Sequence, residues 1–325
     1  MELKLPAKDC VIGLSPMDDV TDMPFRQLCK EMGADWLVTE FIASEALNRD
    51  AEKSLRKMRF TPEQRPIGIQ VFGANEEELL RCLDVVAQAG PDFIDINWGC
   101  PVRKVAGRGA GSGILQDIPR MLAITAAMVR RSPLPVTVKT RLAYSSDTMP
   151  VTDFAEALQD TGIAALSIHG RTKAQMYGGV ADWTMIGQVK NNPRIRIPVF
   201  GNGDIASGAQ AVEQWRRHGV DGILIGRAAV GNPWLFEQCR RAFDGLPERE
   251  ITVQERVDVC RRHLLAAADF YGERTAVFSL RRHYGNYFKG LFNFKPYRLA
   301  LGAAATVGAT LEVLDRVSEC YRAQA

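Results

Sequence analysis

The chain has 325 residues, of which 46% are hydrophobic and 24% charged, a composition that excludes a disordered or fibrous protein. Its seven cysteines are odd in number and include no C-x-x-C pair, so we expect neither a disulfide framework nor a metal site, and a reducing, cytoplasmic location. No run of about 18 apolar residues occurs, and we expect no membrane span.

Short apolar runs rich in Val, Ile and Leu recur through the first 226 residues and predict buried strands. They are Val11–Ser15, Trp36–Thr39, Ile67–Phe72, Phe93–Asn97, Val136–Thr140, Ala165–His169, Ile197–Gly201 and Gly222–Gly226. Segments of helical period separate them: Pro24–Met32 behind a capping Asp22, Glu76–Gln88, Ile118–Arg130, Thr152–Asp160, Trp183–Val189 and Ser207–His218. Eight alternating units favour an α/β fold, a closed (β/α)₈ TIM barrel over residues 1–242, rather than an open sheet.

After Pro247 the pattern becomes helical throughout. Thr252 and Glu255 form a capping box that opens a helix to about Phe270, and further helical stretches follow at Thr275–Lys289 and Thr310–Arg322. We predict a small all-helical C-terminal domain over residues 250–325, joined to the barrel by the linker Phe243–Arg249.

The net charge of +3 is unevenly distributed. Residues 1–239 hold 27 basic and 28 acidic side chains, whereas residues 240–325 hold 14 and 10. Between 271 and 300 six basic residues, among them Arg281, Arg282 and Lys289, interleave with tyrosines and phenylalanines. Such a segment suits RNA, although a solvated helical face and an aromatic helical core explain the same residues.

A barrel's active site lies at the carboxyl ends of its strands, and every strand end here carries a polar or special residue. They are Pro16, Met17, Glu40, Gln70, Asn97, Cys100, Lys139, Arg141, His169, Arg171, Asn202, Gly203, Asp204, Gly226 and Arg227. The glycines after the seventh and eighth strands, together with Arg227, favour a phosphate site over simple tight turns.

Three of these residues suggest chemistry. Lys139 interrupts a buried strand and needs a phosphate, a carboxylate or an electron-rich ring as its partner. His169 ends an apolar run, and beside Lys139 a site role is favoured over a core role. Cys100 lies on a glycine-rich and arginine-rich loop that we expect to form a flexible lid, which favours an acid or nucleophile over a buried hydrophobe.

Together these residues resemble the tRNA-dihydrouridine synthase family. The matching pieces are Ser15-Pro-Met17, Ile69-Gln-Val-Phe-Gly73, Asp95-Ile-Asn-Trp-Gly-Cys-Pro101, Val138-Lys-Thr-Arg141, His169-Gly-Arg-Thr172, Gly201-Asn-Gly-Asp204, Ile225-Gly-Arg227 and Arg281-Arg-His-Tyr-Gly285. They cover nearly the whole chain, and the D-x-N-x-G-C-P element is the most specific of them.

The resemblance implies an FMN in the barrel mouth. Pro16, Met17 and Asp18 would line the flavin ring, Gln70, Lys139 and His169 would meet its polar edge, and Asn202, Gly203, Asp204, Gly226 and Arg227 would hold the phosphate end. NADPH would reduce the FMN, flavin N5 would pass hydride to C6 of a uridine in the tRNA D-loop, and Cys100 would protonate C5. Asn97, Arg141, Arg171, Arg281, Arg282 and Lys289 would contact the substrate.

Two other functions remain open. An FMN barrel oxidoreductase for a small pyrimidine-like molecule would share the flavin site but would leave the basic helical domain unexplained. An RNA-binding protein with a relic barrel would not need Cys100, Lys139 or the phosphate loops. We expect tRNA as the partner and a monomeric protein.

Overall fold

The computed structural model describes residues 3–322, so residues 1–2 and 323–325, at the outer ends of the two predicted domains, lie outside the described part. Its strands are β1 (Val11–Leu14), β2 (Leu37–Val38), β3 (Ile42–Ala43), β4 (Ile67–Phe72), β5 (Phe93–Trp98), β6 (Val136–Arg141), β7 (Ala165–His169), β8 (Val199–Asn202) and β9 (Gly222–Ile225). All pairings are parallel, in the order β1-β9-β8-β7-β6-β5-β4-β2, and a bridge from Gly13 to Trp36 joins the two ends. The predicted eight-stranded barrel is confirmed, and β3 adds a short extension on β4.

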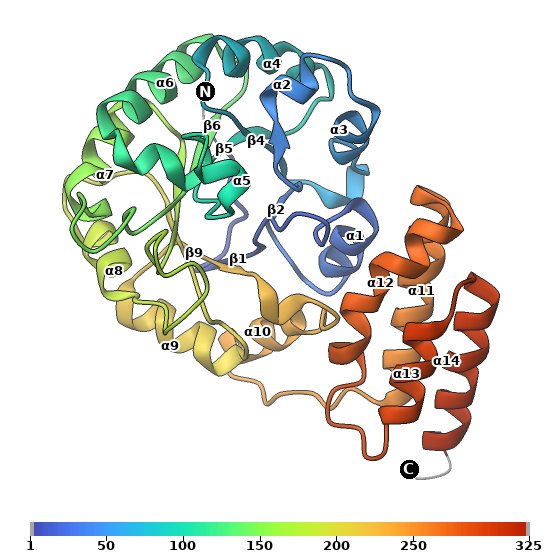
Figure 1. Cartoon of the computed structure of the whole chain (residues 1–325). Helices are drawn as coiled ribbons and strands as arrows, with labels where there is room; N and C mark the ends of the chain where they lie inside the picture. The colour runs from blue at the N-terminus through green and yellow to red at the C-terminus, as the bar shows by residue number, and fades with distance from the viewer. Residues whose placement is uncertain (1–2, 323–325) are drawn as a thin grey trace.

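Helices surround this barrel (Figure 1). They are α1 (Met23–Glu31), α2 (Ser44–Leu47), α3 (Glu52–Lys57), α4 (Glu76–Gln88), α5 (Arg103–Ala106), α6 (Ile118–Arg131), α7 (Val151–Asp160), α8 (Thr184–Lys190), α9 (Gly208–His218) and α10 (Leu235–Phe243), with 3₁₀ turns η1 (Pro62–Gln64), η2 (Gly111–Gln116) and η3 (Arg227–Ala229). Asp22 caps α1 as predicted, because its carboxylate accepts from the N–H of Phe25.

Aromatic side chains close the amino-terminal end of the barrel. The rings of Trp36 and Phe93 stack with their centroids 4.1 Å apart, and Phe200 meets Trp36 edge-on at 5.4 Å. Gly68 allows this packing, because a Cβ at that position would lie 2.1 Å from the ring of Phe93. This apolar floor leaves the carboxyl-terminal half of the barrel interior for the polar residues Gln70, Asp95, Asn97, Lys139 and His169.

Four helices follow the barrel: α11 (Val253–Tyr271), α12 (Glu273–Tyr287), α13 (Lys295–Ala303) and α14 (Val307–Arg322). The capping box of Thr252 and Glu255 opens α11 as predicted. This helical bundle has a hydrophobic cluster of its own that also includes Leu28 and Trp234 of the barrel, and Figure 1 shows it beside α1 and α10. The all-helical C-terminal region is therefore confirmed, and it packs against one side of the barrel.

Arg249, in the segment between α10 and α11, forms ion pairs with both helices. Its Nε lies 2.8 Å from Glu237 of α10, and its Nη1 lies 2.6 Å from Glu255 of α11. Within residues 3–322, no helix combines the length and apolar composition needed to cross a membrane.

Candidate active site

A cavity of about 690 Å³ opens at the carboxyl-terminal mouth of the barrel. Most of the residues predicted from the sequence line it: Pro16, Met17, Asp18, Asn97, Cys100, Lys139, Arg141, His169, Asn202, Gly203, Asp204, Gly226 and Arg227. The others lie outside its lining: Glu40, Gln70, Arg171, Arg281, Arg282 and Lys289. The barrel thus brings residues from all along its sequence to one hollow.

Two arginines converge on Asp204 in the loop after β8. Nη2 of Arg171 lies 2.6 Å and Nη2 of Arg227 lies 3.1 Å from its carboxylate, which also accepts from the N–H of Ala181 at 2.8 Å. Burial opposes ionisation and is the largest single effect on the pKa of Asp204. The hydrogen bonds from Arg171 and from the N–H of Ala181, together with the charges of both arginines, outweigh it and lower this pKa. The carboxylate is therefore occupied by cations, while the Arg227 side chain stays 56% exposed and available to an anion.

Lys139 and His169 lie on neighbouring strands and share a cationic environment. Nζ of Lys139 donates to Oδ1 of Asn202 at 3.1 Å, and burial, followed by the charge of Arg141, lowers its pKa to about 8. Burial and the surrounding cations lower the pKa of His169 to about 2, so its ring is neutral. Nη1 of Arg171 lies 3.3 Å from its Nε2. Because a guanidinium can only donate, the proton of this imidazole resides on Nδ1.

The Cys100 thiol lies at the cavity wall, in the loop after β5. The residue is only 7% exposed, and burial raises the pKa of its thiol, so Sγ keeps its proton at neutral pH. The backbone N–H and the hydroxyl of Ser112 both donate to the carbonyl of Cys100, at 3.0 and 2.9 Å.

The second half of the glycine run 107–113 differs from the expected flexible lid, whereas Gly107 is exposed. Residues Gly111–Leu115 are buried within η2, directly against the loop that carries Cys100. Gly111 has a φ of +52°, and a Cβ there would lie 2.8 Å from the Cys100 carbonyl. The glycines therefore allow a close backbone approach that supports the cysteine, which is a different use from the mobility that the sequence suggests.

Arg141 holds the loop after β7 in place. Its guanidinium donates to the backbone carbonyls of Gly99, Thr172 and Met176, at 2.7, 2.9 and 2.8 Å. The guanidiniums of Arg141 and Arg227 both lie over the ring of Tyr177, 5.6 and 5.3 Å from its centroid. Sequence reasoning missed Tyr177, because it lies in a polar loop eight residues beyond the end of β7.

Comparisons with known proteins identify the family of this chain. The family model described as "Dihydrouridine synthase (Dus)" matches residues 13–323. The chain belongs to the dihydrouridine synthase family. It is 38% identical over 301 residues to tRNA-dihydrouridine synthase B of Xanthomonas campestris pv. campestris, covering 92% of this chain and 90% of the relative. The enzyme of the same name from Pseudomonas aeruginosa is 36% identical over 288 residues, covering 88% and 86%.

Solved structures share the barrel at low identity. Histamine dehydrogenase from Rhizobium sp. 4-9 is 11% identical and aligns with a TM-score of 0.55 over 78% of this chain and 48% of its own. A morphinone reductase variant in complex with tetrahydroNAD, also 11% identical, aligns with a TM-score of 0.51 over 75% and 89%. These likenesses show the fold alone.

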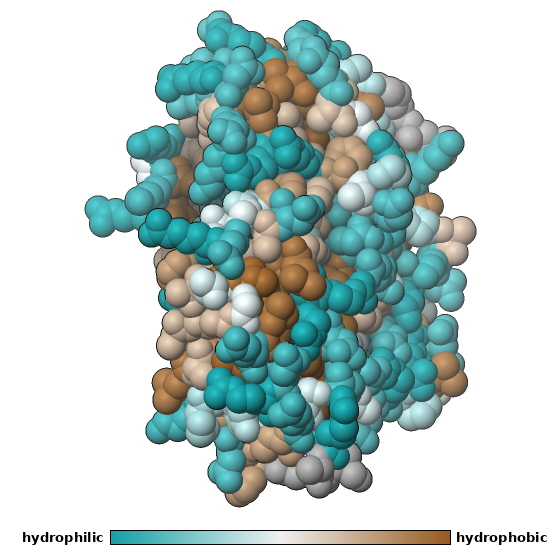
Figure 2. Space-filling model, turned by 90° about the vertical axis from the view of Figure 1, so that its right-hand side faces the viewer, coloured by the Kyte–Doolittle hydropathy of each residue, from teal (hydrophilic) through white to brown (hydrophobic). Residues whose placement is uncertain are grey.

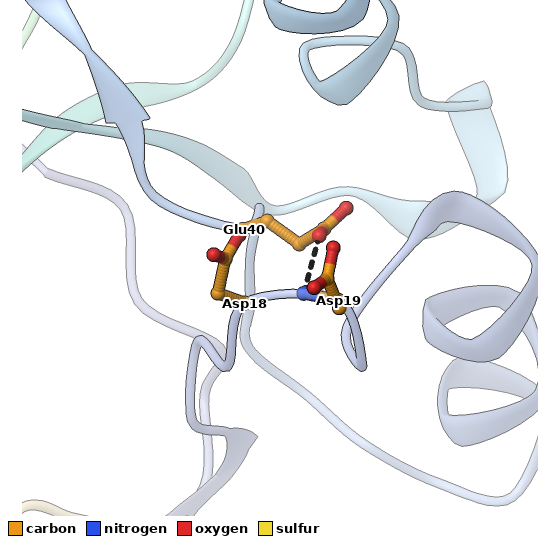
Figure 3. Close-up of side chains that lie close together, drawn as sticks. All are labelled: Asp18, Asp19 and Glu40. Carbon is orange, nitrogen blue, oxygen red and sulfur yellow. Dashed lines mark hydrogen bonds between the residues drawn. The ribbon is translucent and has the colours of Figure 1, made fainter. Parts of the chain in front are cut away.

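In this member of the family, the group of three carboxylates shown in Figure 3 includes Asp18 of the cavity lining. Asp18, Asp19 and Glu40 lie close together, and the N–H of Asp19 donates to Glu40 at 2.7 Å. Lys57 forms ion pairs with Asp18 and, at 3.3 Å, with Glu40. Burial opposes its charge, but these carboxylates raise the pKa of Lys57 overall. Lys57 therefore offsets part of the negative charge of the three carboxylates, and Nζ of Lys53 lies 4.0 Å from Asp19.

The basic residues of the helical bundle in this family member lie apart from the cavity. Arg282 of α12 donates to the backbone carbonyl of Asp19 at 2.6 Å, and Arg281 donates to the carbonyl of Ala304 at 3.1 Å. Lys289 follows α12 and is exposed. Most aromatic residues of this region form the bundle core, but Phe278 and Phe292 are exposed. The face that carries the bundle accordingly mixes hydrophilic and hydrophobic residues (Figure 2).

Proposed function

We propose that this chain is a tRNA-dihydrouridine synthase that reduces the C5–C6 double bond of a uridine in the D-loop of tRNA, with NADPH as the electron donor and FMN as the cofactor. The proposal is carried by one observation: Cys100 with a protonated thiol, Lys139 and two arginines line the same cavity. The names of the curated relatives support the same activity.

The residues of the cavity fit an FMN. A volume of about 690 Å³ is within the usual range for small-molecule sites. Gly226 faces this space, and a Cβ there would meet only Ser15 and Met17, at 3.8 and 3.9 Å. The exposed guanidinium of Arg227 suits a phosphate dianion. When bound, FMN supplies hydride transfer to C6 of the uracil.

Each predicted residue then has a task that its contacts allow. Backbone atoms of Pro16, Met17 and Asp18 would flank the ring, with Lys139 and the Nδ1–H of His169 at its polar edge. Gln70 is fully buried, so it would support that edge from beneath, through Asn97. The remaining residues would hold the phosphate end: Asn202, Gly203, Gly226 and Arg227, with Asp204 orienting the arginine.

Cys100 would supply the proton at C5. A thiol whose pKa is raised by burial remains a donor at neutral pH, which a general acid requires. Asn97 lines the same cavity, and its Oδ1 already accepts from two backbone N–H groups. Any hydrogen bond from Asn97 to the substrate must therefore be donated, which suits a carbonyl oxygen of uracil.

A uridine stacked in tRNA must leave the stack to enter a barrel mouth. Such a substrate explains the basic helical bundle beside the barrel, where Arg281, Arg282 and Lys289 would contact RNA phosphates. Arg141 and Arg171 would act mainly by holding the loop after β7, since both donate to its carbonyls.

The test is product formation on defined substrates. Purified protein is incubated with NADPH and unmodified tRNA or free uridine, and dihydrouridine is quantified by nucleoside mass spectrometry. We expect product from tRNA, with little from free uridine. Product from free uridine or another small pyrimidine alone would favour the small-molecule oxidoreductase, and a flavin-free protein that binds tRNA would favour the RNA-binding alternative.

A further inference from the structure

A continuous set of buried hydrogen bonds connects Asp95 to the loop that carries Cys100. Nε2 of Gln70 donates to Oδ2 of Asp95 at 2.5 Å, and Nδ2 of Asn97 donates to Oε1 of Gln70 at 2.8 Å. Oδ1 of Asn97 then accepts from the backbone N–H groups of Gly99 and Cys100, at 3.0 and 2.8 Å. The side chains of Asp95, Gln70 and Asn97 are all buried.

The barrel register brings these side chains together. Gln70 pairs with Asp95 across β4 and β5, so both side chains point into the barrel interior. Asn97 lies two residues beyond Asp95 on β5 and therefore points to the same side, one level closer to the mouth. Thr137 of β6 pairs with Asp95 from the other side and donates to its Oδ1.

Both ends of this network require the same orientation of its two amides. Burial raises the pKa of Asp95 to about 6, so at pH 8 its carboxylate has no proton to donate. Gln70 must therefore turn Nε2 toward it and Oε1 toward Asn97. The backbone N–H groups at the other end can only donate, so Asn97 must turn Oδ1 toward them and Nδ2 toward Gln70. Reversing either amide would place two acceptors or two donors against each other in a buried site, which is costly.

We propose that Asp95 and Gln70 are positioning residues for Cys100, acting through Asn97 on the two peptide N–H groups of its loop. The loop conformation is thereby determined by the strands β4 and β5 as well as by contacts within the loop itself. The network holds the peptide of the cysteine, and Cys100 lines the cavity. This inference concerns the position of the thiol and does not depend on the identity of the substrate.

Exchanging the carboxylate and the amide tests the network. In Asn97→Asp alone, the new carboxylate faces Oε1 of Gln70, which places two acceptors together. If the amide of Gln70 turns over, its Oε1 faces the carboxylate of Asp95, which again places two acceptors together. In the double variant Asp95→Asn with Asn97→Asp, every bond can form again with Gln70 turned over. Asp95→Asn alone is the matched control, because its amide can accept from Gln70 and donate to Thr137.

Two measurements on the FMN-loaded protein at pH 8 report the loop directly. Hydrogen exchange resolved by mass spectrometry reads the N–H groups of Gly99 and Cys100, and peptide mapping reads the alkylation rate of Cys100 by iodoacetamide. We expect both rates to rise at least tenfold in Asn97→Asp and to remain within threefold of wild type in Asp95→Asn and in the double variant.

Gln70→Met supplies a second test, because it removes the middle of the network without changing a residue of the loop. We expect the same tenfold rise in both rates, whereas a merely local role of Asn97 leaves them unchanged. If Asn97→Asp does not fold, this variant alone decides. Unchanged rates in Gln70→Met, or a double variant as fast as Asn97→Asp, would overturn the proposal.

Discussion

Replacing Asp204 with alanine removes the carboxylate that Arg171 and Arg227 share, and we expect a loss of folding stability larger than that caused by removing Arg227 itself. Arg171 is buried, and its other contacts are the carbonyls of Gly178 and Gly179 and the ring of His169. Removing one partner of a buried ion pair costs about 3–5 kcal/mol.

The structure places the expected loss below that range. The Asp204 side chain is 34% exposed, so water can replace part of the lost interaction, and the two carbonyls remain. We expect Asp204→Ala to lower the free energy of unfolding by about 2 kcal/mol. The Arg227 side chain is 56% exposed, and removing its half of the pair should cost only about 0.2–1 kcal/mol.

Urea unfolding of the flavin-free proteins measures both losses, and titration with FMN measures affinity. Arg227→Ala should bind FMN at least about tenfold more weakly, since a charge-assisted hydrogen bond contributes about 1.5–3 kcal/mol. Equal losses of stability in the two variants would refute the assignment of Asp204 as the residue that orients the arginines. Unchanged FMN affinity in Arg227→Ala would refute the phosphate role of Arg227.

Three further predictions concern stability and RNA binding. Burial lowers the pKa of His263 to about 3, so the stability that its neutral ring contributes is fully present above pH 6.5 and is lost as the pH falls toward 3. Between these pH values, the free energy of unfolding measured in urea should change with pH less steeply in His263→Gln than in wild type, by up to about 1.4 kcal/mol per pH unit. An identical pH dependence in the two proteins would contradict this. Gly68→Ala should lower the free energy of unfolding by about 1–3 kcal/mol, because its Cβ would meet the ring of Phe93 at 2.1 Å; an unchanged denaturation midpoint would contradict the tight barrel floor. Neutralising the basic residues Arg281, Arg282 and Lys289 of the bundle should weaken tRNA binding and make the affinity depend less on salt, as measured by filter binding at several salt concentrations. An unchanged salt dependence would show that these residues do not contact tRNA phosphates.

The barrel was predictable because buried parallel strands leave continuous apolar runs in the sequence. Each predicted run corresponds to a strand of the barrel, although β2 is only two residues long. Helices α10 and α13 were missed. Helix α10 (Leu235–Phe243) was missed because it follows the eighth strand closely and continues into the expected linker. Helix α13 (Lys295–Ala303) was missed because the aromatic residues before it suggested RNA contacts. The range 41–66, in which the sequence predicts no element, contains only short elements that leave no periodic signal. The boundaries at residues 242 and 250 stay predictions.

Part of the site was predictable, because the carboxyl ends of all strands in a barrel meet at the same mouth. That rule placed Cys100, Lys139 and Arg227 at one cavity. It could not show that Arg171 is buried behind the lining, or that the glycine run supports Cys100, because both depend on loop packing between distant segments. Tyr177 left no signal for the same reason. The directions of the amides of Gln70 and Asn97 likewise follow from tertiary contacts alone.

Single-turnover kinetics test whether Cys100 is the proton donor to a tRNA uridine. Enzyme reduced with NADPH is mixed with unmodified tRNA, and flavin reoxidation and dihydrouridine are followed for wild type and Cys100→Ala. We predict flavin reduction within twofold of wild type and tRNA-dependent reoxidation slower by at least about 100-fold, the usual contribution of a general acid. Reoxidation and dihydrouridine formation at the wild-type rate in Cys100→Ala would contradict the account.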